Sequence, residues 1–150
     1  MKKIDISATE RKQGSKYPPP YDLPCRERVR HVLGDAAGLT QFGVNLLRLL
    51  PGAWSSQRHW HAAEDEFVWV VEGEVVLVTD QGEELLVAGD CAGFKAGEPN
   101  GHHLQNRSSR DALLLEIGSR DPEDETDYPD IDLHVNDTWG FTHRDGTSYK

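Results

Sequence analysis

The chain has 150 residues, of which 37% are hydrophobic and 28% are charged, a composition typical of one globular domain. With 26 acidic and 16 basic residues, the net charge of −10 disfavours general binding to nucleic acid or to an anionic membrane surface. Since no apolar run approaches the ~20 residues of a membrane span and the two cysteines fit no zinc-binding spacing, we expect a cytoplasmic protein with reduced thiols and no nucleic-acid or membrane partner.

Residues 1–24 are polar and rich in proline, which predicts an N-terminal arm. The consecutive prolines at positions 18–20 favour an extended segment without internal hydrogen bonds. Tyr17 and Tyr21 flank these prolines, so part of the arm is expected to pack on the domain or on a partner chain.

Between residues 25 and 120, short apolar runs recur at roughly 8–12-residue spacing with glycines between them, a pattern typical of an all-β domain. No sustained helical periodicity competes with this pattern. We therefore predict an antiparallel β-barrel or jelly roll, with hairpin turns at residues 72–73 and 80–82. The expected strands are Val29–Leu33, Val44–Leu50, Phe67–Val71, Val75–Val78, Leu85–Ala88 and Leu113–Ile117.

The remaining residues, 121–150, begin with the acidic sequence DPEDETDYPD, which predicts a solvated loop. The sequence after it is too apolar for a free tail and is expected to pack on the barrel or across a subunit interface. Its apolar residues are Ile131, Leu133, Val135, Trp139 and Phe141.

Two histidines separated by one residue, His59 and His61, are the most informative chemical feature. On a strand, side chains two residues apart point to the same face. Glu66 follows five residues later, and a third imidazole is available from His102 or His103. Two or three imidazoles with one carboxylate are a ligand set for a first-row transition metal that leaves positions open for water or substrate.

The glycines around this pair complete a longer pattern. The spacing of Gly52, His59, His61, Glu66 and Gly73 resembles the first conserved motif of the cupin superfamily. That motif has Gly, about five residues, His-x-His, three or four residues, Glu, six residues and Gly. The sequence departs from it by one residue in the first gap.

A second block also resembles the cupins, less closely. It contains Gly89, Gly97, His102 and Asn106, whereas Lys95 replaces the usual proline and the gap from Gly97 to His102 is four residues instead of two. The His-x3-Asn spacing is retained. The resemblance extends over about residues 40–118, and at a finer level the chain is similar to small single-domain bacterial cupins, some of which are described as sugar-phosphate-isomerase-like by analogy.

The resemblance implies a cupin barrel that holds one divalent transition metal, which could be Fe, Mn, Ni, Cu or Zn. The family spacing selects His102 over its neighbour His103. The implied metal ligands are His59, His61, Glu66 and His102.

The function that follows from the resemblance is that of a small-molecule metalloenzyme, an isomerase, lyase or oxygenase, acting on a polar substrate inside the barrel. The alternative is a metal-dependent cupin that binds or senses a small molecule without turnover, and a structural cupin without metal is a third hypothesis. No acid–base residue can be assigned. A homodimer is expected, because small cupins commonly pair and both terminal segments carry apolar groups.

Several neighbouring residues have weaker assignments. Arg58 alternates with the histidines and is expected to face outward in a structural role, while Gln57 shares their parity and is expected near the cavity mouth. Asn106 is in phase with His102 along the chain and is expected to face a ligand, although turn formation is a common use of Asn.

Cys91 is in phase with the inward side chains of its strand, which predicts a buried thiol. The roles of Lys95, His103 and Cys91 stay open.

Overall fold

The computed structural model describes residues 2–136, 138 and 140–149. Within these ranges the chain is almost entirely β-structure. The helical elements are one short α-helix, α1 (Leu33–Ala36), and two 3-10 turns, η1 (Ile6–Ala8) and η2 (Leu23–Cys25). No helix in the described part of the chain is long and apolar enough to cross a membrane.

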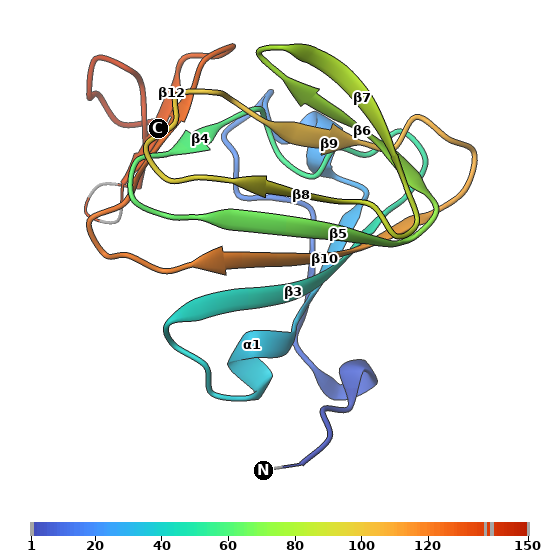
Figure 1. The fold of residues 1–150 in the computed structure, drawn as a ribbon. Helices are drawn as coiled ribbons and strands as arrows, with labels where there is room; N and C mark the ends of the chain where they lie inside the picture. Colours follow the sequence, from blue (N-terminus) through green and yellow to red (C-terminus); the bar gives the residue numbers. More distant parts are fainter. Residues whose placement is uncertain (1, 137, 139, 150) are drawn as a thin grey trace.

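The largest sheet has six antiparallel strands in the order β1-β2-β3-β10-β5-β8. It forms the lower layer in Figure 1, with α1 beneath β3. The strands are β1 (Arg11–Gln13), β2 (Arg28–Val32), β3 (Phe42–Leu49), β10 (Ala112–Ser119), β5 (Glu66–Glu72) and β8 (Cys91–Phe94).

Two smaller antiparallel sheets complete the fold, in the orders β7-β6-β9 and β13-β12-β11-β4. Their strands are β4 (Trp60–His61), β6 (Glu74–Thr79), β7 (Gly82–Val87), β9 (His103–Gln105), β11 (Glu125–Tyr128), β12 (Leu133–Asn136) and β13 (Gly140–Thr142). The prediction of an all-β antiparallel jelly roll is confirmed. The hydrogen-bonded ladders of the described residues nevertheless form three separate sheets and do not close into one barrel.

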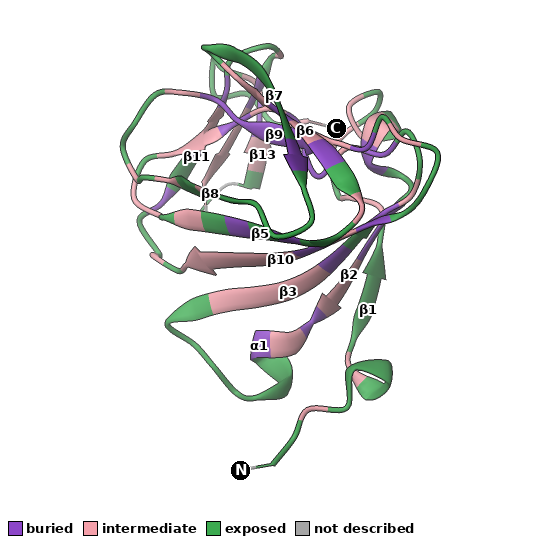
Figure 2. Cartoon of the chain, turned by 45° about the vertical axis from the view of Figure 1, so that its right-hand side comes forward, coloured by how far each residue is buried: buried purple, intermediate pink, exposed green. Residues whose placement is uncertain are grey.

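The hydrophobic core lies between the six-stranded sheet and the three-stranded sheet above it (Figure 1). Because strand side chains alternate between faces, buried residues alternate with more exposed ones where the strands cross the core, as Val68 and Val70 do in β5 and Val75 and Leu77 in β6. At ~25 cal/mol per Å² of buried apolar surface, this packing supplies the main stabilisation of the fold. The core includes Leu47, Leu49, Val68, Val70, Val75, Leu77, Leu86, Leu104 and Leu114. β7 is exposed along most of its length at the edge of the upper sheet (Figure 2).

The two predicted turns have different roles. Residues 80–82 connect β6 to its partner β7, as predicted. Gly73 follows β5 directly, but β5 and β6 belong to different sheets, so the predicted hairpin at residues 72–73 is wrong. Gly73 is a corner instead: its φ is +78°, and a Cβ atom there would lie 2.7 Å from the carbonyl oxygen of Asp111. Only glycine allows this close approach while the chain changes sheets.

The acidic segment, predicted to be a solvated loop, contains β11, which pairs with β4 and β12. The prediction failed because it rested on the acidic residues alone. Thr126 and Tyr128 alternate with Asp127 and are buried, so one face of the segment belongs to the interior. Leu133 after it is also fully buried, whereas the predicted packing of Trp139 falls outside the described residues.

The N-terminal arm is attached to the largest sheet. Its β1 forms the edge beside β2. Tyr17 then packs between Tyr128 and Phe141, with ring centroids 5.7 and 5.6 Å apart, respectively. The N-terminal arm and the C-terminal segment therefore pack against each other.

Candidate metal centre

Backbone pairing places the two histidines of the HxH pair beside different neighbours. His59 forms an isolated antiparallel bridge with His102, through reciprocal backbone hydrogen bonds of 3.2 and 2.9 Å. His61, in β4, pairs with Thr126 of β11. The imidazole rings of His59 and His61 lie 5.0 Å apart at an interplanar angle of 88°. The expectation that i and i+2 side chains share a face is met.

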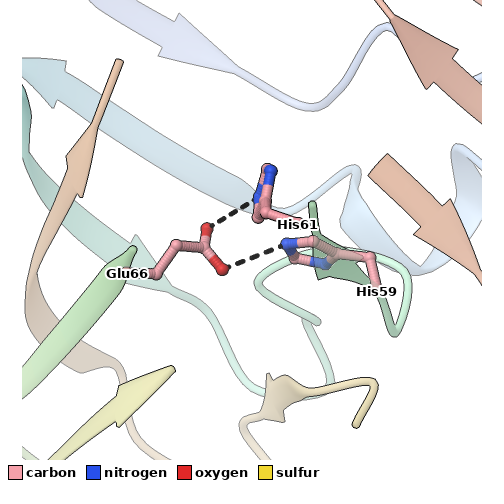
Figure 3. Close-up of side chains that lie close together, drawn as sticks. All are labelled: His59, His61 and Glu66. Atoms are coloured by element: carbon pink, nitrogen blue, oxygen red, sulfur yellow. Dashed lines mark ion pairs between the residues drawn. The ribbon is translucent and has the colours of Figure 1, made fainter. Parts of the chain in front are cut away.

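Glu66 is the first residue of β5 and faces these histidines (Figure 3). The Nε2 atom of His59 lies 3.3 Å from its Oε2, and Nε2 of His61 lies 3.3 Å from its Oε1. One donor atom from each of the three residues lies within 4.8 Å of both others. Three side chains from two strands and a connecting segment thus converge on one point.

His102 approaches the same carboxylate. Its Nε2 lies 2.5 Å from Oε2 of Glu66, and its ring centroid is 4.7 Å from that of His59. The ring stacks on Phe94 at 3.6 Å with an interplanar angle of 2°. Its Nδ1 is buried without a hydrogen-bond partner among the described residues. Stacking and backbone pairing therefore hold this ring in place.

The remote ring nitrogens of the HxH pair have acceptors as partners. Nδ1 of His59 donates to the carbonyl oxygen of Gln57 at 2.8 Å. Nδ1 of His61 lies 2.6 Å from Oδ2 of Asp124, whose other oxygen accepts the backbone N–H of Ala63 at 2.8 Å. Because carbonyl and carboxylate oxygens only accept, Nδ1 carries the proton in both rings. When such a ring carries no second proton, the lone pair of its Nε2 points toward Glu66.

The charges in this cluster are strongly coupled. Burial raises the pKa of Glu66, but the surrounding histidines outweigh it and hold that pKa well below the usual range. Burial lowers the pKa of His61, but hydrogen bonds to Glu66 and Asp124 outweigh it and raise that pKa to about 9. The carboxylate is therefore ionised and attracts positive charge, whether a proton or a metal ion.

This arrangement fits a transition metal. Lone pairs on the Nε2 atoms of two neutral rings would face a carboxylate that also only accepts, so the favourable occupant of the space between them is a cation. Asp124 completes the carboxylate–histidine pairing that commonly orients metal-binding imidazoles. Asp124 is a candidate site residue that no sequence motif marked, because its contact with His61 depends on the pairing of β11 with β4.

The cluster opens into a cavity of about 840 Å³ between the sheets and the N-terminal arm. This volume lies in the range of small-molecule binding sites. Polar and charged residues from β1, β2 and β3 also line this cavity. Those residues include Lys12, Arg28, Arg30 and Asn45.

Other singled-out residues lie outside the carboxylate cluster. Arg58 forms ion pairs with Asp80 and Asp130, which is the structural role expected for it. Gln57 is buried and donates to the carbonyl oxygen of Tyr21, so the prediction that it lines the cavity mouth is wrong. Asn106 donates to the carbonyl oxygen of Arg110 and accepts the backbone N–H of Ser108, which is a turn-stabilising role, and it also donates to the carbonyl oxygen of Leu49.

Cys91 is exposed, which contradicts its predicted inward parity. In β8 the inward positions are those of Ala92 and Phe94, which pack against the core. His103 donates from Nδ1 to the carbonyl oxygen of Ser56 at 2.9 Å, and burial lowers its pKa to about 4. Lys95 is exposed beside a small hollow near the cluster.

Comparison with known proteins identifies the family of this chain. The cupin domain family matches residues 45–118. A cupin-superfamily sugar phosphate isomerase from Silicibacter pomeroyi is 49% identical, with a TM-score of 0.93 over 99% of this chain and 97% of that chain. A protein from Acidithiobacillus ferrooxidans, provisionally named a sugar phosphate isomerase, is 29% identical, with a TM-score of 0.73 over 82% of this chain and 80% of that chain.

A more distant structure, the polyketide cyclase RemF from Streptomyces resistomycificus, is 20% identical, with a TM-score of 0.61 over 79% of each chain, and shows likeness of fold alone. No curated protein matches the sequence. The family match and the 49% identity over nearly the whole length of the Silicibacter pomeroyi protein establish that this chain belongs to the cupin superfamily.

Proposed function

We propose that this protein is a metal-dependent enzyme that acts on a polar small molecule in the cavity beside the histidine cluster. The observation that carries the proposal is the convergence of three imidazole Nε2 atoms on one carboxylate. The proposed ligands of a single divalent transition metal are His59, His61, Glu66 and His102. Its identity among Fe, Mn, Ni, Cu and Zn stays open, because mixed imidazole–carboxylate sites accept all of them.

When bound, the metal would supply a Lewis acid that holds and polarises an oxygen of the substrate. The surrounding residues have definite tasks in this proposal. Asp124 keeps His61 in the tautomer that presents Nε2, and the carbonyl of Gln57 does the same for His59. Phe94 fixes the plane of His102 and covers one side of it from water.

Among isomerase, lyase and oxygenase chemistry, we favour isomerisation. The support is the sugar phosphate isomerase from Silicibacter pomeroyi, at 49% identity. The alternative, a cupin that binds or senses a small molecule without turnover, is supported by the lack of an assigned acid–base residue outside the cluster. Fold alone does not decide between these functions.

One experiment separates these alternatives. The protein is purified without chelators, its metal content is measured by elemental analysis, and the metal-loaded form is assayed for isomerisation of aldose and ketose phosphates and for oxygen uptake. Turnover that disappears on metal removal and returns on reloading supports the enzyme. Stoichiometric metal without turnover favours the binding protein, and a purified protein that neither contains nor takes up metal contradicts both.

The remaining expectations concern organisation. We propose residues 25–120 as the cupin unit, with residues 1–24 as an arm and 121–150 as an attached segment, and a homodimer as the assembly. Exposed apolar side chains on β5, such as Trp69 at 48% exposure, support a subunit interface. Two free cysteines, without a disulfide among the described residues, are consistent with a proposed location in the reducing cytoplasm.

A further inference from the structure

Arg28 on β2 lines the cavity and carries a charge for which the described residues supply no carboxylate partner. Its side chain is buried, with 7% exposure. Nε donates to the carbonyl oxygen of Gly14 at 2.8 Å, and Nη1 donates to the carbonyl oxygen of Ser55. Burial, and next to it repulsion from Arg30, hold the pKa of Arg28 below its usual value. An arginine nevertheless stays protonated, so the charge itself must be accommodated.

Arg30, two residues further along the same strand, provides an internal comparison. Its Nε is ion-paired with Glu116, and Asn45 donates to the same carboxylate at 3.1 Å. Arg30 therefore has the pairing that a buried charge normally requires. The same sheet face thus carries one compensated guanidinium and one uncompensated guanidinium.

The uncompensated guanidinium keeps hydrogen-bonding capacity. Nη2 of Arg28 has no partner among the residues that the structure describes, whereas a guanidinium offers five N–H donors in a planar fork. This fork matches the geometry of phosphate and carboxylate groups. Lys16 also lines the cavity and adds positive charge, whereas Lys12, opposite Arg30 in the β1–β2 pairing, is paired with Glu10 at 3.8 Å.

We propose that Arg28 forms an anion-binding subsite, which holds the phosphate or carboxylate group of a small molecule. An oxyanion at Nη2 would supply the missing counter-charge inside the cavity. The ring of Tyr17, 5.9 Å from the guanidinium carbon, forms the wall beside it. This inference deepens the proposed function, because it defines the substrate class as an anionic molecule.

The subsite and the histidine cluster are joined through a short stretch of chain. Arg28 binds the carbonyl of Ser55, and the hydroxyl of the next residue, Ser56, lies 3.2 Å from Nδ1 of His59. Tyr128 bridges the other side, with ring centroids 5.7 Å from both Tyr17 and His59. Arg28 and the cluster line the same cavity, so in this proposal one molecule places its anionic end at Arg28 and a neutral oxygen-bearing part at the cluster.

The test follows arginine side-chain 15Nε–1H NMR signals of the labelled, metal-free protein during titration with inorganic phosphate and, separately, with acetate at constant ionic strength. We expect a saturable shift of the Arg28 signal, with the signals of Arg30 and Arg107 unchanged. Arg107 is a suitable reference because it is exposed and paired with Glu83. A response to phosphate alone or to acetate alone supports the subsite and identifies the group. No saturable shift at Arg28 with either anion overturns the proposal.

Two variants sharpen the result. Arg28→Lys keeps the charge but loses the fork, so phosphate affinity should fall by about tenfold, as for loss of one charge-assisted hydrogen bond. Arg107→Gln should bind phosphate like the wild type. Wild-type affinity in a folded Arg28→Lys protein would contradict the proposal, and if this variant fails to fold, the wild-type titration still decides.

Zinc binding, measured separately, distinguishes this inference from the proposed function. If phosphate causes no saturable shift at Arg28 while zinc binding is intact, the subsite is refuted and the metal-dependent function is not. A phosphate response at Arg28 in a protein that takes up no metal supports the subsite and refutes the metal-dependent function.

Discussion

Asp124 accepts a hydrogen bond from Nδ1 of His61 at 2.6 Å, although 63 residues separate them. The contact depends on the pairing of β4 with β11, which brings the acidic segment against the histidine cluster. Asp124 is 8% exposed and also accepts backbone N–H groups of Ala63 and Glu64. It therefore fixes both the ring and the turn that follows it.

Replacement of Asp124 by Asn should weaken metal binding. An amide in place of the carboxylate can present its NH2 group to Nδ1, which favours the tautomer with its proton on Nε2. Loss of such a supporting carboxylate typically costs about 10–100-fold in metal affinity. Competition with a chromophoric zinc chelator measures the effect. Glu123→Gln, an exposed acid of the same segment, serves as the control, and equal affinities for both variants would show that Asp124 has no orienting role.

The choice between adjacent histidines gives a second prediction. His59→Ala, Glu66→Ala and His102→Ala should lose bound metal, because each removes a group that meets at the same point. His103→Ala should retain it, since His103 is held by the carbonyl of Ser56 instead. Elemental analysis of the folded variants measures the outcome. Metal retained by His102→Ala but lost from His103→Ala would reverse the assignment.

The sequence predicted the strands that are long and apolar. The six expected runs correspond to β2, β3, β5, β6, β7 and β10, because a core-facing strand must repeat apolar residues at alternate positions. The short strands β4, β9 and β11 lack that signal. Their side chains are mainly polar, and they are strands because long-range partners complete their hydrogen bonds.

The same distinction separates the predicted and missed parts of the site. His59 and His61 share a face by local geometry, and Glu66 begins an apolar strand that local pattern identifies. Asp124 and Arg28 acquire their roles only when β11 and the N-terminal arm dock, so no local spacing marks them. The prediction that Cys91 is buried was wrong for a related reason. The strand that contains it is short, and too few residues alternate along it to show which face is inward.

The metal-free protein should show a pH-dependent stabilisation that originates at His61. Its folded-state pKa of about 9 is above the usual ~6.5, so protonated His61 stabilises the fold fully below about pH 6.5. This contribution is lost as the pH rises through about 9. We expect the difference in free energy of unfolding between wild type and His61→Gln, measured by urea denaturation with EDTA, to shrink over this interval. A difference independent of pH would contradict the coupling to Glu66 and Asp124.

The outward face of β5 predicts how a dimer would be disrupted. Phe67, Trp69 and Val71 alternate with buried valines and are 36%, 48% and 45% exposed. If a second copy covers them, Trp69→Lys should convert the dimer to a monomer, because a charge would be buried in an apolar interface. Sedimentation equilibrium at micromolar concentration measures this change. Glu72→Lys, a charge change on the same strand, is the control, and a monomeric wild type would refute the dimer.

The corner at Gly73 gives a stability prediction with an internal control. Gly73 and Gly52 both have positive φ, +78° and +87°, so alanine at either position should cost about 1 kcal/mol from backbone strain. A Cβ at Gly52 would meet nothing within 4 Å, whereas at Gly73 it would meet the Asp111 carbonyl oxygen at 2.7 Å and Cα of Ala112 at 3.0 Å.

Because both contacts at Gly73 are with backbone atoms, relief requires movement of β10 against β5, which adds roughly 1–3 kcal/mol of overpacking strain. Urea denaturation should therefore rank the proteins as wild type, then Gly52→Ala, then Gly73→Ala, with unchanged denaturant dependence for all three. Equal losses for the two variants would mean that the corner between the sheets relaxes freely. In that case the close approach of β5 and β10 would not be what requires glycine at this position.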